Sequence, residues 1–261
     1  MDGPCLTSFI RLATELAELS GEIIRRYFRT PVAVETKADT SPVTAADREA
    51  EAAMRQRIET AYPDHGVIGE EFGPARADAE YVWVLDPIDG TKSFISGKPL
   101  FGTLIGLVHQ GAPILGVIDH PALDERWIGA RGEGSTFNGD PVKARPCPGL
   151  GEAILFATSP FMFEGADADA FDRLCREVKY PLFGTDCYGY GLLASGFADL
   201  VVEAKLRPYD YVALVPVVEG AGGVMTDWGG RPLNLASDGR VIAAGDRRTH
   251  EECLKVLGQS G

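Results

Sequence analysis

The strongest restriction on the fold of this chain comes from the run Trp83-Val84-Leu85-Asp86-Pro87-Ile88-Asp89-Gly90-Thr91. Its apolar first half predicts a short buried strand, which carries the two aspartates to a turn at Pro87. The pair Gly90-Thr91 then marks the start of a helix. Two carboxylates on one turn can share hard cations, and the free N–H groups at a helix N-terminus can bind an anion. Metal ions beside an anion site are what the hydrolysis of a phosphate ester needs.

Asp86 and Asp89 also have an ordinary interpretation. An aspartate in a tight turn often caps a helix, and for an isolated Asp-x-x-Asp-Gly segment that interpretation would be favoured. The buried strand before the motif and the acidic residues elsewhere favour metal binding instead. The two carboxylates and the Ile88 carbonyl would give Mg²⁺ the hard oxygen ligands that it prefers. Gly90 would let the backbone approach an anion closely, and Thr91 adds a hydroxyl group.

Two adjacent acids, Glu70 and Glu71, follow the predicted strand Val67-Ile68-Gly69. Neighbouring carboxylates both ionise at low cost only beside a cation or in plentiful water. A solvated surface pair is therefore one interpretation, and by itself the more common one. The other is that one of the two binds metal, and we expect that residue to be Glu70.

Two further aspartates, Asp47 and Asp210, lie where helices should begin. The segment Thr44-Ala45-Ala46-Asp47 has the spacing of a capping box, and Asp210 follows Pro208 at a second helix start. Capping is therefore one interpretation of both residues. The other is that Asp47 orients the Thr91 hydroxyl toward an attacking water, while Asp210 joins an acidic cluster that only cations would make tolerable.

The composition limits the possible partners. The chain has 261 residues, of which 45% are hydrophobic, and a formal net charge of -13 at pH 7. This length allows one large domain or two lobes with a sizeable core. The acidic balance argues against nucleic acid or an anionic membrane as a partner. It would also repel a phosphate substrate unless bound divalent cations reverse the local charge.

The five cysteines are odd in number and scattered, without a Cys-x-x-Cys pair. This usage indicates neither a disulfide framework nor a zinc site. The sequence shows no signal-like N-terminus and no apolar run that could span a bilayer. We therefore expect a soluble protein of a reducing compartment, most simply the cytoplasm.

Hydrophobic periodicity predicts helices and strands in both halves of the chain. Helices are expected at 6–29, 44–61, 167–177, 186–195, 210–221 and 247–257, with Pro216 kinking or delaying the fifth. Strands are expected at 67–69, 81–85, 103–108, 114–118, 126–130, 135–137, 153–157, 200–203, 224–227 and 241–244. The Pro- and Gly-rich segment 145–151 is the candidate boundary between an N-terminal lobe, 1–147, and a C-terminal lobe, 148–261, of one structural unit. The pattern indicates a mixed α/β layered architecture.

These motifs, in order along nearly the whole chain, resemble those of the inositol monophosphatase family of Mg²⁺-dependent phosphatases. The matching segments are Val43-Thr44-Ala45-Ala46-Asp47, Gly69-Glu70-Glu71, Trp83 to Thr91, and Glu219-Gly220-Ala221-Gly222-Gly223. The resemblance implies a mixed α/β (α+β) fold, the layered α-β-α-β-α sandwich of the inositol monophosphatase and fructose-1,6-bisphosphatase type. It also implies a homodimer.

Carried onto the matching positions, the resemblance implies roles for individual residues. The ligands of two or three Mg²⁺ ions would be Glu70, Asp86, the Ile88 carbonyl, Asp89 and Asp210. The phosphate would be held by Gly90 and Thr91. The attacking water would be positioned by Asp47 and Thr91 together with Glu70.

The segment around Asp210 departs from the family pattern. The family commonly has Trp-Asp-x-Ala-Gly there, whereas this chain has Tyr209-Asp210-Tyr211-Val212-Ala213, so the ligand is kept while its packing differs. Segments 184–197 and 206–211 look more like the histidinol-phosphate phosphatases of the family. Asp186 and Glu203 would then attract the ammonium and imidazole groups of histidinol phosphate. The alternatives are a helix cap for Asp186 and an exposed strand end for Glu203.

We therefore expect Mg²⁺-dependent hydrolysis of a small phosphate monoester, histidinol phosphate, without a phosphoenzyme. One alternative is a phosphatase that acts on inositol phosphate or a sugar phosphate. A more remote one is a non-catalytic protein that binds metal or a metabolite as a sensor. The set of Asp47, Glu70 and Thr91 disfavours the sensor, because a sensor does not need to activate water.

Overall fold

The computed structural model describes residues 6–36 and 42–258. Its helices are α1 (Leu6–Tyr27), α2 (Ala45–Ala61), α3 (Thr91–Ile95), α4 (Ala166–Glu177), α5 (Tyr188–Ala194), α6 (Pro208–Tyr211), α7 (Leu214–Gly220) and α8 (Arg247–Leu257). Its strands are β1 (Val34–Thr36), β2 (Pro42–Thr44), β3 (Gly66–Gly69), β4 (Gly73–Ala75), β5 (Tyr81–Asp89), β6 (Gly102–His109), β7 (Ala112–His120), β8 (Glu125–Ala130), β9 (Gly134–Phe137), β10 (Asp140–Pro141), β11 (Ile154–Ala157), β12 (Tyr180–Phe183), β13 (Leu200–Glu203), β14 (Val224–Thr226) and β15 (Val241–Ala244).

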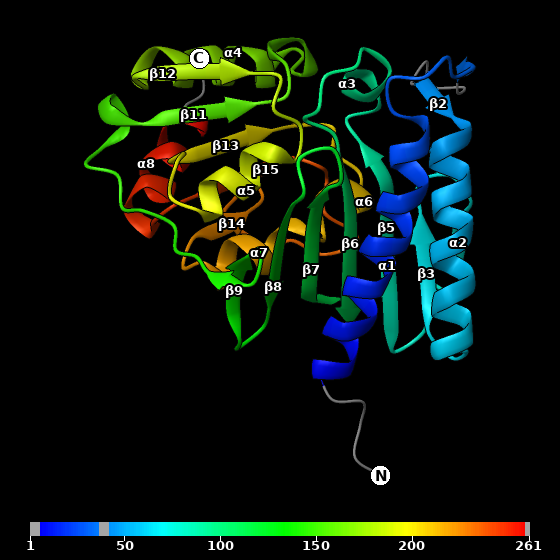
Figure 1. Cartoon of the computed structure of the whole chain (residues 1–261). Helices are drawn as coiled ribbons and strands as arrows, with labels where there is room; N and C mark the ends of the chain where they lie inside the picture. Colours follow the sequence, from blue (N-terminus) through cyan, green and yellow to red (C-terminus); the bar gives the residue numbers. More distant parts are fainter. Residues whose placement is uncertain (1–5, 37–41, 259–261) are drawn as a thin grey trace.

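Helices and sheets alternate in five layers (Figure 1). Helices α1 and α2 cover one face of an eight-stranded sheet with the order β10-β9-β8-β7-β6-β5-β3-β4. Helices α5, α6 and α7 form the middle layer. A five-stranded sheet with the order β12-β11-β13-β15-β14 follows, and α4 and α8 close the other side. The predicted α-β-α-β-α sandwich is confirmed, and the two sheets come from opposite sides of segment 145–151.

Strand β5 is buried on both faces from Val82 to Leu85, which explains why this part of its sequence is apolar. Trp83 and Leu85 pack into the core under α1 and α2. Val82 and Val84 point the other way, into the core shared with the middle helices. Side chains alternate across a strand, so a strand between two helical layers needs apolar residues at every position.

The segment after Leu85 differs from the expected turn. Strand β5 continues to Asp89, with a break in register between the pairs Asp86–Leu104 and Asp89–Gly102. Pro87 and Ile88 therefore lie opposite the single residue between Leu104 and Gly102 on β6, which is the geometry of a β-bulge. A bulge tolerates proline because no ladder hydrogen bond is needed there. The bulge, not a turn, brings the two aspartates to the same end of the sheet.

Three aligned glycines form a seat for the middle layer. The register pairs Gly106 on β6 with Gly116 on β7, and Gly116 with Gly129 on β8. A Cβ atom at Gly116 would lie 1.8 Å from the Ala213 carbonyl oxygen, and at the other two glycines 2.8 and 2.3 Å from atoms of segment 212–217. The backbone between α6 and α7 can therefore rest directly on the sheet only because these residues lack side chains.

We expect Gly116→Ala to destabilise the protein by about 1 to 3 kcal/mol, the usual range for forcing extra atoms into a packed core. The new methyl group would collide with backbone, which cannot rotate away as a side chain could. Urea unfolding of both proteins measures the difference. Gly151→Ala is the matched control, because a Cβ there meets open space. An equal stability of the two variants would contradict the proposed seat.

The helix expected at 210–221 is divided into α6 and α7, which Val212 and Ala213 separate. Pro216 lies in the first turn of α7. Proline has no N–H group, and its ring excludes the carbonyl four residues earlier from helical hydrogen bonding. The predicted late start of this helix is confirmed. Strand β12, in contrast, was not expected, because it is a largely exposed edge strand without regular alternation.

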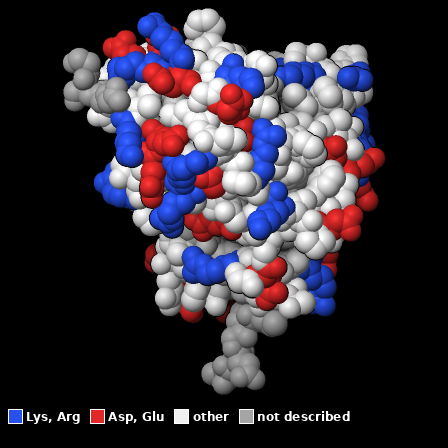
Figure 2. Space-filling model, turned by 90° about the vertical axis from the view of Figure 1, so that its left-hand side faces the viewer, with Lys and Arg blue, Asp and Glu red and all other residues white. Residues whose placement is uncertain are grey.

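The surface mixes charges of both signs. Figure 2 shows the face on the left-hand side of Figure 1, where lysine and arginine side chains are interspersed with aspartate and glutamate. Among the helices of the described residues, none has the length and apolar character needed to cross a bilayer. Cys147, Cys175, Cys187 and Cys253 are free thiols, and Cys5 lies outside the described residues.

Candidate active site

Three carboxyl groups from distant parts of the chain meet at one end of the large sheet. Oxygen atoms of Asp86, Asp89 and Asp210 all lie within 4.8 Å of one another, and we call these residues the acidic cluster. The first two come from the bulge in β5 and the third from α6, which packs against β5 and β6. Carboxylates this close repel one another unless protons or cations lie between them.

A backbone N–H group fixes each carboxylate of the cluster. The Ile88 N–H donates to Asp86 Oδ1 at 3.0 Å, within the bulge itself. The Cys187 N–H donates to Asp89 Oδ2 at 2.7 Å, and the Arg207 N–H donates to Asp210 Oδ2 at 2.6 Å. Asp89 therefore does not cap α3, whereas Asp210 does take part in capping α6.

Glu70 joins this group because of how two strands pair. Strands β3 and β5 are parallel, and their register pairs Gly69 with Leu85. The residues that follow, Glu70 and Asp86, therefore emerge side by side, and the Glu70 N–H donates to the Leu85 carbonyl at 3.2 Å. The side chains of Glu70 and Asp86 are hydrogen-bonded to each other.

Burial and like charge raise the pKa values throughout the cluster. Desolvation is the main cause for Asp86, followed by the charges of Glu70, Asp89 and Asp210, and its pKa lies well above the ordinary range. The pKa of Asp89 is also raised well above that range, by desolvation and then by Asp186 and Asp210. Desolvation raises the pKa of Asp210 to about 7. Groups held in such a state bind cations readily.

Asp47 takes the capping role, which is one of the two roles that the sequence left open. Its Oδ2 accepts from the Thr44 N–H at 2.8 Å and from the Thr44 hydroxyl at 2.6 Å, so the capping box is present. Its Oδ1 is buried without a hydrogen-bond partner. Desolvation raises the pKa of Asp47, and the charge of Glu70 adds to this effect. A buried oxygen without a partner suits a water or a ligand.

Gly90 and Thr91 form the start of α3 beside the cluster. Gly90 has a φ of +82°, and a Cβ atom there would lie 2.9 Å from the Asp186 carboxyl group. Glycine thus allows both the left-handed backbone and the close approach of Asp186. The Thr91 hydroxyl donates to the Ile88 carbonyl at 3.2 Å and so lies next to that oxygen, not on Asp47.

Asp186 and Glu203 line the same cavity as Asp89 and Asp210, and its volume is about 140 Å³. Glu203 is not an exposed strand end, since it is 3% exposed and accepts from the Thr158 N–H at 2.8 Å and the Tyr190 hydroxyl at 2.9 Å. Asp186 does not cap α5, which begins at Tyr188. The two alternatives to a binding role are therefore wrong.

A sequence model described as the inositol monophosphatase family matches residues 6–261. The chain belongs to the inositol monophosphatase family.

Individual relatives agree with this membership in the family. The bifunctional phosphatase IMPL2, chloroplastic, of Arabidopsis thaliana is 50% identical over 261 residues, which are 97% of this chain and 75% of the relative. A histidinol-phosphatase of Chlorobaculum parvum is 39% identical over 240 residues, 91% of this chain and 93% of the relative. The solved structure of an inositol monophosphatase from Zymomonas mobilis is 49% identical, with a TM-score of 0.91 over 98% of this chain and 100% of that one. This member of the inositol monophosphatase family is thus a phosphatase.

Enzymes of the inositol monophosphatase family are generally Mg²⁺-dependent, and the residues present fit that ion. The acidic cluster offers closely spaced carboxylate oxygens, which are hard ligands. Among the described residues, the cluster consists of carboxylates alone, and oxygen ligands suit Mg²⁺ better than softer metals.

The raised pKa values predict how Mg²⁺ stabilises this family member at different pH values. The pKa of Asp210 is about 7 in the folded chain against an ordinary 3.8, so the folded state keeps a proton that the unfolded state has lost. The stability of the chelated protein, which is the metal-free protein kept in EDTA, therefore falls as pH rises from about 4 through 7. Mg²⁺ takes the place of the protons, so the rise in Tm on adding Mg²⁺ should be larger at pH 8 than at pH 6.

Calorimetry with EDTA or with excess Mg²⁺ measures this rise in Tm, and NaCl of equal ionic strength is the control. An equal rise at both pH values would contradict it.

Sequence reasoning missed several residues that hold the site together. Among these are Cys187 and Tyr190, whose backbone N–H and hydroxyl groups fix Asp89 and Glu203. The Ser93 hydroxyl donates to Asp186 Oδ2 at 2.6 Å. Lys98 donates a hydrogen bond to the Gly184 carbonyl. Desolvation raises the pKa of Asp186, while the hydrogen bond from Ser93 and the positive charge of Lys98 limit that rise. Their only signal is their place in segments 91–98 and 184–197, because contacts between those segments cannot be inferred from either alone.

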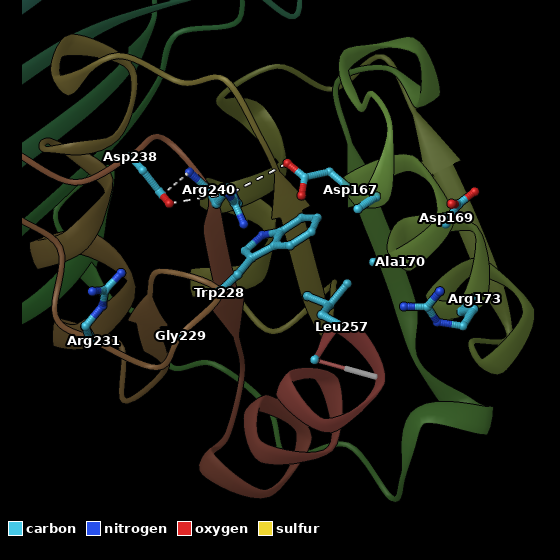
Figure 3. Close-up of a pocket in the computed structure, with 12 residues that line it drawn as sticks. Asp167, Asp169, Ala170, Arg173, Trp228, Gly229, Arg231, Asp238, Arg240 and Leu257 are labelled. Carbon is cyan, nitrogen blue, oxygen red and sulfur yellow. Dashed lines mark hydrogen bonds and ion pairs between the residues drawn. The ribbon is translucent and has the colours of Figure 1, made fainter. Parts of the chain in front are cut away.

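A larger cavity, of about 650 Å³, lies elsewhere, between α4, α8 and the turn after β14 (Figure 3). Trp228 lies at its centre. Arg240 is 3.5 Å from carboxylate oxygens of both Asp167 and Asp238, as the dashed lines show. Because acids and arginines are paired there, this cavity does not concentrate charge of one sign as the acidic cluster does.

Proposed function

We propose that this chain hydrolyses L-histidinol phosphate to L-histidinol and phosphate with the help of Mg²⁺. The observation that carries the proposal is a cavity lined by two further carboxylates, Asp186 and Glu203, together with Asp89 and Asp210 of the acidic cluster. The pair from the cluster would bind cations beside the phosphate, and the further pair would bind a positively charged alcohol. A neutral polyol needs no such second pair of acids.

In this proposal, two or three Mg²⁺ ions are held by the acidic residues and one carbonyl. The ligands would be Glu70, Asp86, the Ile88 carbonyl, Asp89 and Asp210. Bound Mg²⁺ would supply positive charge that neutralises the phosphate and lowers the pKa of the attacking water.

The remaining residues of the site would bind and orient. The backbone N–H groups at Gly90 and Thr91, at the start of α3, would bind phosphate oxygens. Glu70, Asp47 and the Thr91 hydroxyl would orient the water for in-line attack on phosphorus. Asp47 Oδ1 is suited to this role because it is buried, close to Glu70, and without another partner.

The proposed substrate carries an ammonium group and an imidazole. Glu203 is fixed by the Thr158 N–H and the Tyr190 hydroxyl, so its carboxylate is oriented before the substrate arrives. Asp186 is fixed by Ser93. The name of the Chlorobaculum parvum relative, a histidinol-phosphatase, supports this choice. The Zymomonas mobilis structure, named an inositol monophosphatase, makes inositol phosphate the alternative substrate.

A comparison of substrates tests the proposal. We expect kcat/KM to be higher for L-histidinol phosphate than for inositol 1-phosphate, in a Mg²⁺-dependent phosphate-release assay. Glu203→Gln should lower kcat/KM for histidinol phosphate by about tenfold, because a hydrogen bond to a charged group is worth about 1.5 kcal/mol or more.

The same variant supplies its own control. Its kcat/KM for a neutral ester such as inositol 1-phosphate should change little. A wild-type preference for inositol 1-phosphate would refute the substrate, and an absence of phosphate release from either ester would favour the sensor. A homodimer and a cytoplasmic location stay predictions, which light scattering and fractionation of the source cells can test.

A further inference from the structure

The turn that presents Glu70 is unusually short. Strands β3 and β4 are antiparallel and pair Gly69 with Gly73, so only residues 70–72 form the turn. The Glu70 N–H is bonded to the Leu85 carbonyl of β5. The next two N–H groups, of Glu71 and Phe72, belong to the turn and lie outside the pairing of β3 and β4, so they need other partners if they are to be fixed.

Both partners come from one side chain on α2. Glu51 Oε2 accepts from the Glu71 N–H at 2.7 Å, and Oε1 accepts from the Phe72 N–H at 3.1 Å. The Glu51 side chain is 0% exposed. A buried carboxylate is costly unless it is paired and fully hydrogen-bonded, so this arrangement is stable only as a complete unit.

Arg55 completes that unit. Its Nε donates to Glu51 Oε1 at 2.7 Å, one helical turn further along α2. Its Nη2 donates to the Gly73 carbonyl, and its guanidinium lies 6.0 Å from the centre of the Phe72 ring. The pair of Glu51 and Arg55 therefore holds the whole turn from residue 71 to residue 73.

Gly69 makes room for this pair. A Cβ atom at Gly69 would lie 2.1 Å from Glu51 Oε1 and 2.8 Å from Arg55 Nη2. The residue directly before Glu70 is thus a glycine at a point where the buried carboxylate needs the space. The position of Glu51 and the backbone of the turn are matched to each other.

The same face of α2 also carries Asp47, one turn before Glu51, because residues four apart lie above one another on a helix. Asp47 is close enough to Glu70 for their charges to interact. We propose that Glu51, paired with Arg55, is a positioning residue that fixes Glu70 through the backbone of residues 71 and 72, so that one helix sets both acids that orient the water. This inference rests on the proposed function.

The experiment uses Glu51→Gln, which keeps the shape of the side chain but removes the charge and one acceptor. In the chelated protein, we expect the amide protons of Glu71 and Phe72 to exchange at least about tenfold faster than in the wild type. The Mg²⁺ affinity, measured by titration calorimetry, should fall about tenfold, the lower end of the effect seen when partners behind metal ligands are lost. Excess Mg²⁺ should then restore part of kcat/KM.

Glu59→Gln is the matched control on the same helix, since Glu59 forms an exposed ion pair with Arg76 at 3.8 Å. The proposal is overturned if Glu51→Gln and the control bind Mg²⁺ equally well, because Glu51 then only stabilises the turn. It is also overturned if the two amides exchange as in the wild type.

If Glu51→Gln does not fold, Arg55→Lys is the milder variant, because it keeps the positive charge and loses the bond to Gly73. The same measurements apply, with weaker Mg²⁺ binding expected and unchanged binding contradicting the proposal. Amide exchange and Mg²⁺ affinity do not depend on turnover. They therefore decide the role of Glu51 even if the chain hydrolyses no phosphate monoester.

Discussion

Asp89→Asn should lower kcat by at least about a thousandfold, or about 4 kcal/mol of transition-state stabilisation, and yet raise the Tm of the chelated protein. The activity falls because the acidic cluster loses a charged oxygen ligand. The stability rises because Asp89 is desolvated and repelled by Asp186 and Asp210, as its raised pKa shows. The Asn side chain keeps an oxygen that can accept from the Cys187 N–H, so the fold is retained.

The exposed Asp78 supplies the control, and Asp78→Asn should leave both kcat and the response to Mg²⁺ unchanged. Steady-state kinetics and calorimetry, with EDTA and with Mg²⁺, distinguish the outcomes. A near-normal kcat for Asp89→Asn would remove Asp89 from the set of ligands. A lower Tm without metal would show that Asp89 stabilises the fold, against the argument from charge repulsion.

A second large effect is expected where two glutamates adjoin. Glu70→Gln should lower kcat by about a hundredfold or more, in the range that loss of a residue acting on the attacking water produces. Glu71→Gln should stay close to the wild type, although it removes the same charge one residue away. The difference arises because the register of β3 and β5 places Glu70, not Glu71, beside Asp86.

The kinetics of the two variants should be measured over a range of Mg²⁺ concentrations. If Glu70 is both a ligand and an orienting group, excess Mg²⁺ will restore the apparent affinity of Glu70→Gln but not its kcat. Equal losses in Glu70→Gln and Glu71→Gln would show that the site responds to total charge alone. In that case the assignment of Glu70 would be wrong.

Much of the fold follows from local patterns in the sequence. Amphipathic helices such as α1 and α8 have periodicities that decide their type, and their observed bounds lie close to the expected ones. The apolar run also predicted strand β5 and its start, but the strand continues four residues beyond the expected end, to Asp89. Pro216 indicated that the helix expected at 210–221 would be interrupted, and the structure divides it into α6 and α7. The edge strand β12 was missed because it is exposed and short, so no apolar pattern marks it.

The candidate site was predictable in its residues more than in its geometry. Asp86 and Asp89 lie in one segment, so the sequence alone predicts that they are close. Their relative orientation depends on a β-bulge, whereas the sequence predicted a turn there. The approach of Asp210 depends on the seat of Gly106, Gly116 and Gly129, which becomes visible only when three strands are aligned. The contact of Glu51 with the turn after β3 likewise joins residues whose proximity no local pattern encodes.

The middle helical layer has a consequence for how a substrate enters. Helix α7 packs against β7, β8 and β9 of the large sheet and also against β14 of the small one. A hinge rotation of the halves, like that of a clamshell, would have to pull this shared helix off one of them. We therefore expect a substrate to enter without such a rotation, and we expect neither half of the chain to fold when it is expressed alone.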